Sequence, residues 1–236
     1  MTILENILFL DIETVPLLPS FDDLSEEKKA LWEKKCKLLS RYQPEEESKA
    51  EELYERAGIY AEFGKIICIS VGYFSKDQLR VKSFYDDDEK VLLTEFARLV
   101  QQHFSRPQHR LCAHNGKEFD YPYIARRMLI NGIKLPPILN ITGKKPWENP
   151  HLDTLEMWKF GDYKHYTSLE LLASVFDIPT PKDDIDGSQV CEIYWKENDL
   201  KRIVNYCQKD VITVVRLFQK MNILSMVEDE QILIIE

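Results

Sequence analysis

The chain has 236 residues, of which 44% are hydrophobic, and a formal net charge of −9. This length and apolar content allow a sizeable core, so we expect residues 1–236 to form a single domain. The acidic balance excludes a protein that coats nucleic acid through bulk positive charge, because that mode of binding needs many Lys and Arg side chains at the phosphates.

The cysteine pattern and the N-terminal residues bear on the compartment. Five cysteines, an odd number, show neither C-x-x-C spacing nor a disulfide framework, which is typical of reduced thiols. The apolar run from Ile7 to Leu10 is short and leads directly into Asp11, unlike an export signal. We therefore expect a cytoplasmic protein with no membrane partner.

The first predicted strand is Ile7 to Ile12, a compact apolar run that we expect to stop at Thr14-Val15-Pro16. It would present Asp11 and Glu13 near its end. Residues 22–57 are dense in Glu and Lys with scattered Leu, Trp and Tyr, which predicts one or two surface helices inserted after this strand.

The following elements predict an α/β fold. Two apolar segments separated by a short polar turn indicate a hairpin, so the first three strands should be antiparallel. Helical spacing and Pro122 in a first turn predict helices after it. The expected strands are 65–74, 79–85 and 110–114, a short segment lies at Leu152, and the expected helices are 92–104, 121–129, about 168–176 and about 198–221.

Three acidic motifs carry the chemistry. Asp11 and Glu13 are two residues apart on a strand, so both side chains leave one face and can hold a metal between them. Taken alone, this pair is equally typical of a strand end that faces water. Asp120 follows a Gly-containing turn at the start of a helix, where an Asp is also a good helix cap without any metal.

The long C-terminal helix carries the third motif. Tyr206 and Asp210 are four residues apart and therefore share one helical face. Beside them runs an apolar stripe that would seat the helix on the core and leave the pair at its edge. That stripe consists of Ile203, Cys207, Val211, Val214 and Phe218. Taken singly, Tyr206 is more typical of packing and Asp210 of a solvated acid.

In chain order, the motifs Asp-x-Glu, Asn-x-x-x-x-Asp and Tyr-x-x-x-Asp closely resemble those of the DEDD 3′-5′ exonuclease superfamily. Tyr206 stands four positions before Asp210, as in the tyrosine subtype, DEDDy, and Asn205 stands where the other subtype has His. The segments FLDIETVP, EFGKIICISVG and HNGKEFD are similar to the predicted exonucleases related to the proofreading domain of family-B DNA polymerases. The resemblance spans roughly Ile7 to Phe218.

The resemblance implies a fold, cofactors and roles. The fold is a ribonuclease-H-like mixed sheet flanked by helices. The cofactors are two divalent metal ions, Mg²⁺ or Mn²⁺, one held by Asp11, Glu13 and Asp210 and a second bridged by Asp11 and supported by Asp120. Tyr206 would orient the attacking water. The partner is the 3′ end of a single-stranded nucleic acid.

Weaker candidates surround these motifs. Asn115 would hold the turn or contact the terminal nucleotide, and Asp153 fits a structural role better than a metal site. Lys and Arg side chains and the loop 142–147 are candidates for phosphate contact and base stacking, although such side chains are usually solvated. These candidates are Lys117, Arg126, Arg127 and Trp147. His114 and His165 lack the spacing of a metal pair and fit packing or surface positions.

Four functions remain open at this point. The leading one is a 3′-5′ exonuclease that releases nucleoside monophosphates, with DNA favoured. An exoribonuclease is the nearest alternative, because recognition of the 2′-hydroxyl depends on pocket shape. A nucleic-acid-binding domain of the same fold that does not cut, and a phosphoesterase of small nucleotides, are the others.

Overall fold

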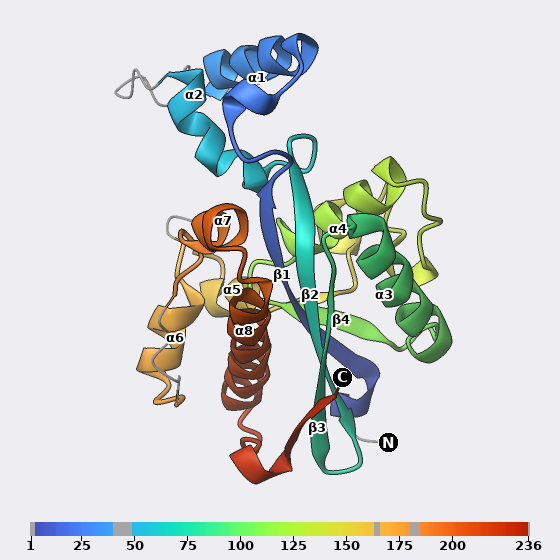
Figure 1. The fold of residues 1–236 in the computed structure, drawn as a ribbon. Coiled ribbons are helices and arrows are strands. Elements are labelled where there is room, and N and C mark those ends of the chain that lie inside the picture. Colours follow the sequence, from blue (N-terminus) through green and yellow to red (C-terminus); the bar gives the residue numbers. More distant parts are fainter. Residues whose placement is uncertain (1–2, 40–48, 163–165, 180–184, 236) are drawn as a thin grey trace.

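The structure, a computed structural model, describes residues 3–39, 49–162, 166–179 and 185–235. In this part of the chain the centre is a mixed sheet of six strands in the order β5-β4-β1-β2-β3-β6, covered by helices on both faces (Figure 1). The strands are β1 (Ile7–Pro16), β2 (Gly64–Ser75), β3 (Gln78–Tyr85), β4 (Arg110–Ala113), β5 (Leu152–Asp153) and β6 (Ile232–Ile235).

The pairing confirms the predicted fold class. Strands β1, β2 and β3 pair antiparallel, while β4 joins β1, β5 joins β4 and β6 joins β3 in parallel. The three antiparallel strands and the hairpin between β2 and β3 were predicted from alternation and turn residues. Strand β6 was not predicted.

The α-helices are α1 (Glu26–Leu39), α2 (Ala50–Leu53), α3 (Glu89–His103), α4 (Asp120–Ile130), α5 (Thr154–Lys159), α6 (Leu169–Val175), α7 (Val190–Glu192) and α8 (Leu200–Met221). Helices α3, α4, α6 and α8 fall at their predicted places. The sequence prediction missed α5 and α7, which are too short to show a helical repeat.

The two faces of β1 belong to two different cores. Leu8 and Leu10 pack in the cluster that contains residues of α3 and α4. Ile7 and Phe9 pack in the cluster that contains Val211 and its neighbours on α8. Because side chains of a strand alternate between faces, every odd-numbered position of the first half of β1 faces α8.

β1 is longer than the predicted apolar run from Ile7 to Ile12, and it ends at Pro16, the last residue of the segment that was expected to stop it. The strand continues through Pro16, and Val15 and Pro16 pair with Lys65 and Gly64 of β2. The register changes by one residue between Glu13 and Thr14, which is a β-bulge. Pro16 is tolerated because it is the last residue of the strand.

Between β1 and β2, the chain forms α1, α2 and a 3₁₀ helix, Tyr54–Ile59, which Figure 1 shows beyond the far end of the sheet. These helices have an apolar cluster of their own, centred on Trp32, whose indole donates a hydrogen bond to the carbonyl of Ala50 at 2.7 Å. Residues 40–48, within the predicted insertion 22–57, lie outside the described residues. The prediction of one domain with an insertion stays a prediction.

Among the described residues, no helix combines the length and the apolar character needed to cross a membrane. All five cysteines are free thiols.

Candidate active site

Two acidic side chains of β1 lie on the face that α8 covers. The alternation that turns Ile7 and Phe9 toward α8 also turns Asp11 and Glu13 toward it. Both acids precede the bulge, so they pair in the same register with Ser70 and Cys68 of β2. Glu13 is buried, with 8% of its surface exposed.

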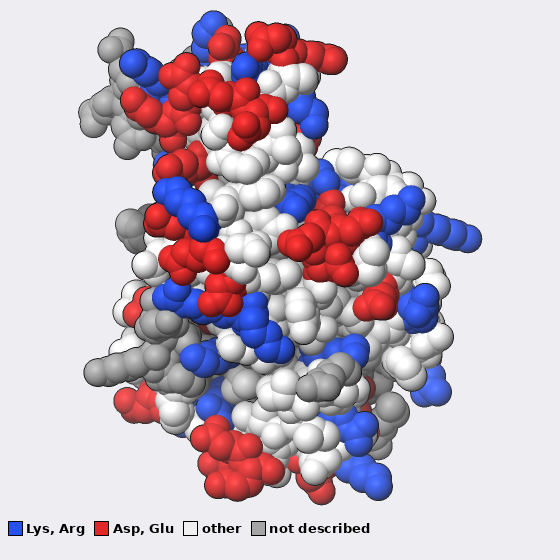
Figure 2. Space-filling view, in the orientation of Figure 1, with Lys and Arg blue, Asp and Glu red and all other residues white. Residues whose placement is uncertain are grey.

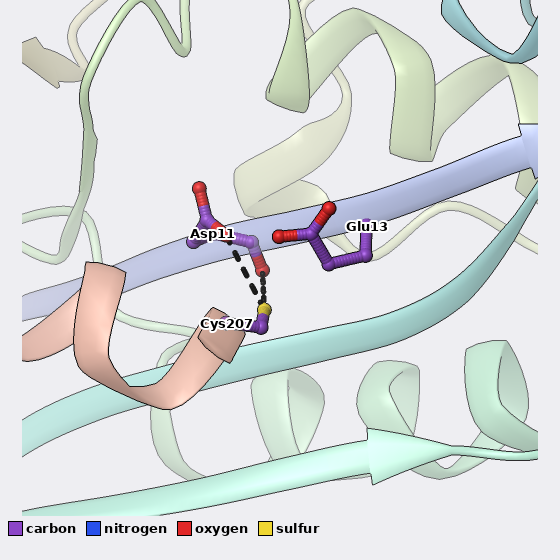
Figure 3. A group of neighbouring side chains, drawn as sticks. All are labelled: Asp11, Glu13 and Cys207. Atoms are coloured by element: carbon purple, nitrogen blue, oxygen red, sulfur yellow. Dashed lines mark hydrogen bonds between the residues drawn. The ribbon is translucent and has the colours of Figure 1, made fainter. Parts of the chain in front are cut away.

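Helix α8 meets these acids through Cys207. Its thiol donates hydrogen bonds to the Asp11 carboxylate, at 3.3 Å, and to the Asp11 backbone carbonyl, at 3.5 Å. Figure 3 shows the two acids beside each other on β1, with Cys207 reaching them from α8. One ligand atom each from Asp11, Glu13 and Cys207 lie within 4.8 Å of one another.

Asp120 approaches the two acids of β1 from the start of helix α4. It is the first residue of α4 and only 3% exposed, and its carboxylate is hydrogen bonded to the backbone of Ile12, between the two acids of β1. Phe119, not Asp120, holds the cap position, so the alternative reading of Asp120 as the helix cap is wrong.

The turn before α4 explains this placement. Asn115 adopts a left-handed conformation with φ of 63°, and its carbonyl accepts hydrogen bonds from the backbone N–H groups of Glu118 and Phe119. Asn tolerates this conformation better than most residues. The turn-forming role of Asn115 is therefore the one that the geometry supports.

Tyr206 and Asp210 lie at the edge of α8, as predicted. Cys207 and Val211, one position further round the helix, are fully buried, whereas Tyr206 and Asp210 are partly exposed. The Tyr206 hydroxyl is hydrogen bonded to Asp210. Burial, followed by the charges of Asp210, Glu13 and Asp11, raises the pKa of Tyr206 far above its usual range, so the phenol stays protonated.

The charges of the four acids affect one another's ionisation. Burial raises the pKa of Asp11 well above its usual value, and the charges of Glu13, Asp210 and Asp120 raise it further. Burial likewise raises the pKa of Glu13, with Asp210, Cys68 and Asp120 adding to the effect. Burial also raises the pKa of Asp120, to about 7. The structure thus brings together the four acids that the sequence singled out.

This donor set fits a divalent cation. Carboxylate oxygens are the ligands that hard cations such as Mg²⁺ and Mn²⁺ prefer. Ionising buried carboxylates that repel one another costs free energy, because the charges lose water and lie close together. A cation bound among them offsets this cost. The side chains that would hold it are Asp11, Glu13, Asp120 and Asp210.

Residues 59–232 match the family of predicted 3′-5′ exonucleases related to the exonuclease domain of PolB. The chain belongs to this family. The matched part includes Asp120, Tyr206 and Asp210, and it begins after the two acids of β1. The nuclease motifs read from the sequence and the family assignment therefore agree.

Among solved structures, the chain resembles the family B DNA polymerase from the hyperthermophilic archaeon Pyrobaculum calidifontis. The two share 14% sequence identity with a TM-score of 0.47, over 91% of this chain and 26% of the polymerase chain. The chain thus spans about a quarter of the length of that polymerase.

Asp153 has the structural role that was favoured for it. It is the N-cap of α5, and its carboxylate accepts hydrogen bonds from the backbone N–H groups of Leu155 and Glu156. It also accepts hydrogen bonds from the backbone N–H groups of Asn115 and Lys117, each at 3.0 Å. Asp153 therefore fixes the turn that leads to Asp120.

The residues that were candidates for phosphate contact differ in their surroundings. Arg127 is buried and forms an ion pair with Glu89, so its assignment to phosphate contact is wrong. Lys117 pairs with Glu156. Arg126 is exposed, as is Trp147, at 76%, with the Lys145 ammonium 5.2 Å from the centre of its ring.

His114 is a packing residue, as expected. One ring nitrogen is hydrogen bonded to the Thr154 hydroxyl and the other to the Thr167 carbonyl, both at 2.9 Å. His165 lies outside the described residues.

Sequence reasoning missed two residues near the acids. Cys207 was assigned to the apolar stripe of the long helix, and its contact with Asp11 could not be read from that pattern. Partial burial, followed by the charges of Asp120, Asp153, Asp11 and Asp210, raises the pKa of Tyr166. Nothing in its sequence neighbourhood relates Tyr166 to the motifs, since the proximity is purely tertiary.

Proposed function

We propose that this chain is a metal-dependent 3′-5′ exonuclease that hydrolyses phosphodiester bonds of single-stranded nucleic acid, with DNA favoured, and releases nucleoside monophosphates. The observation that carries the proposal is the convergence of Asp11, Glu13, Asp120 and Asp210 from one strand and two helices. Membership of the exonuclease family supports it.

The cofactors in this proposal would be two divalent ions, Mg²⁺ or Mn²⁺, and Asp11, Glu13, Asp120 and Asp210 would hold them. When bound, such ions lower the pKa of water and stabilise negative charge on the attacking and leaving oxygens. The chain's own contribution is to hold the acids close together. The pairing of Asp11 with Ser70 and of Glu13 with Cys68 on β2 fixes the positions of the two acids on β1.

Tyr206 would position the attacking water. Its hydroxyl proton is engaged by Asp210, so the lone pairs of the phenol oxygen are available to accept a hydrogen bond from water. The water oxygen would then form a bond to phosphorus while the bond between phosphorus and the 3′ oxygen breaks, and a proton from the water would end on the released 3′ oxygen. The products are a shortened strand with a 3′-hydroxyl and a nucleoside 5′-monophosphate.

The test is a comparison of matched single-stranded DNA and RNA, each labelled at the 5′ end, with Mn²⁺ or Mg²⁺. A ladder of progressively shorter labelled strands is expected, and its relative rate on DNA and RNA identifies the preferred substrate. Immediate release of a labelled mononucleotide would contradict the 3′-5′ direction.

Two other outcomes favour the remaining candidates. Strands that are bound and stay intact with Mn²⁺ indicate the non-cutting domain. Hydrolysis confined to a panel of mononucleotides and dinucleotides indicates a phosphoesterase of small nucleotides. Asp11→Asn serves as the control for contaminating nucleases in every arm.

A further inference from the structure

A pocket of about 370 Å³ adjoins Tyr206 on the outer side of α8. Side chains of the first turns of the helix form one wall, and three of the lining residues are basic. The basic residues are Lys201, Arg202 and Lys209, and Asn205 and Tyr206 lie between them. The pocket therefore begins where the acidic cluster ends.

Helical spacing orders these side chains into two rows. Arg202, Tyr206 and Asp210 are four residues apart and share one row, and Lys201, Asn205 and Lys209 form the adjacent row. Each step of four residues advances about 6 Å along the helix axis. That step is close to the spacing of successive phosphates along an extended single strand.

The opposite wall comes from the segment before α7. Ile185 lines the pocket, and a Cβ placed on Gly187 would lie 4.0 Å from the Tyr206 hydroxyl oxygen. This backbone therefore runs alongside Tyr206. The acidic member of the lining, Asp199, is the N-cap of α8 and accepts a hydrogen bond from the backbone N–H of Arg202.

The local charge of this pocket is opposite to that of the whole chain. Figure 2 shows lysine and arginine side chains over the upper part of α8, on a face that otherwise carries many acidic side chains. Lys201, which lines the pocket, is exposed, and its ammonium lies 5.5 Å from the centre of the Tyr85 ring. A polyanion that approaches an acidic protein would be drawn to such a place.

We propose that this pocket binds backbone phosphates of the substrate strand, immediately upstream of the linkage being cut. The inference rests on the proposed function, because Tyr206 marks the reacting end of the strand. With the terminal linkage at the acidic cluster, the strand continues along α8, and Lys201 and Lys209 contact its next phosphates. Asn205, between them, can donate a hydrogen bond to a phosphate or sugar oxygen.

The experiment combines protein variants with strands that lack one charge. Fluorescent single strands carry one neutral methylphosphonate linkage at successive positions from the 3′ end, and their affinity is measured with Ca²⁺ present. Wild type, Lys201→Ala and Lys201→Ala/Lys209→Ala are compared. Lys220→Ala is the matched control, because it removes the same charge from the last turn of the same helix.

The two pocket variants should bind the fully charged strand several-fold more weakly, and the slope of log affinity against log salt should fall by about 0.7 for each lost contact. When the methylphosphonate occupies one or two particular linkages near the 3′ end, Lys201→Ala and the wild type should bind the strand with equal affinity. Lys220→Ala should behave as wild type. Unchanged Mn²⁺ affinity shows that the variants keep the acidic site folded.

The inference is overturned if Lys201→Ala lowers the affinity by the same factor at every position of the methylphosphonate. It is also overturned if Lys220→Ala weakens binding as much as Lys201→Ala does, or if the wild type binds no strand. The inference would also be overturned if a nucleoside monophosphate competed with the strand for wild type but competed less well for Lys201→Ala. The pocket would then hold the terminal nucleotide. Binding is measured without cutting, so an absence of cleavage with Mn²⁺ contradicts only the proposed exonuclease activity.

Discussion

The thiol of Cys207 donates a hydrogen bond to the Asp11 carboxylate at 3.3 Å, which joins α8 to β1 within the acidic cluster. This contact matters for the choice of variant at position 11. An Asn side chain keeps an oxygen that can accept from the thiol, while it removes one negative charge from the cluster. Asp11→Asn therefore separates the charge of Asp11 from its part in packing.

The variant Asp11→Asn should abolish metal-dependent stabilisation. A cation at one hundred times its dissociation constant contributes about 2.7 kcal/mol, which would raise the Tm of the wild type by roughly 5–10 °C. In EDTA the variant should melt at the same temperature as the wild type or higher, because one repulsive charge is gone. Thermal melts with EDTA and with Mn²⁺ check both expectations, and equal Mn²⁺ shifts in the two proteins would contradict them.

The variant Tyr206→Phe should slow cleavage by roughly a hundredfold, since it removes the hydroxyl that orients the water. Metal affinity should change little, because the phenol is not among the proposed ligands. Since its raised pKa keeps the Tyr206 phenol protonated, the rate of the wild type should show no ionisation of this residue. Single-turnover rates and Mn²⁺ calorimetry measure the two effects, and an unchanged rate would return Tyr206 to a packing role.

Arg127→Met should destabilise the protein by about 3 to 5 kcal/mol, because it leaves the buried Glu89 carboxylate without its partner. Glu89 also accepts a hydrogen bond from the backbone N–H of Ile66, so the pair connects α3, α4 and β2. The exposed neighbour Arg126 provides the matched control, Arg126→Met. Urea unfolding should separate the two variants clearly, and similar losses in both would show that the ion pair contributes little.

His151 should make the protein less stable below neutral pH. Burial lowers the pKa of this side chain from 6.5 to about 4, so the unfolded chain takes up a proton before the folded one does. Its contribution is therefore full above about pH 6.5 and is lost as the pH falls toward 4, with a total on the order of 3 kcal/mol. Comparing urea unfolding of wild type and His151→Gln across this range isolates the effect, which should flatten in the variant.

The sheet and the long helix could be predicted because their signals are local. Alternating or continuous apolar residues marked β1, β2 and β3, and the stripe through Ile203 and Val211 marked α8. β1 ends at Pro16, within the segment that was expected to stop it, but the bulge after Glu13 left no signal in the sequence. The two-residue strand β5 and the six-residue helix α5 are too short to show a repeat.

At the site, the motif residues were singled out because the three motifs occur together in the chain order of a known family, although each motif alone also fits a structural role. Their mutual approach is not visible in the sequence. Arg127 was misassigned. A charged residue on a helix is usually solvated, and only the three-dimensional arrangement shows that Glu89 lies opposite it. Tyr166 and Cys207 depend on contacts between distant segments and left no local signal.

The bulge between Glu13 and Thr14 divides β1 into two stretches whose alignment with β2 is set separately. Asp11 and Glu13 belong to the inner stretch, whereas the path to α1 and α2 starts from the outer one. Evolution can therefore lengthen, shorten or replace the outer helices without shifting either acid by a residue. We expect relatives to diverge most between β1 and β2 while the nuclease centre stays constant.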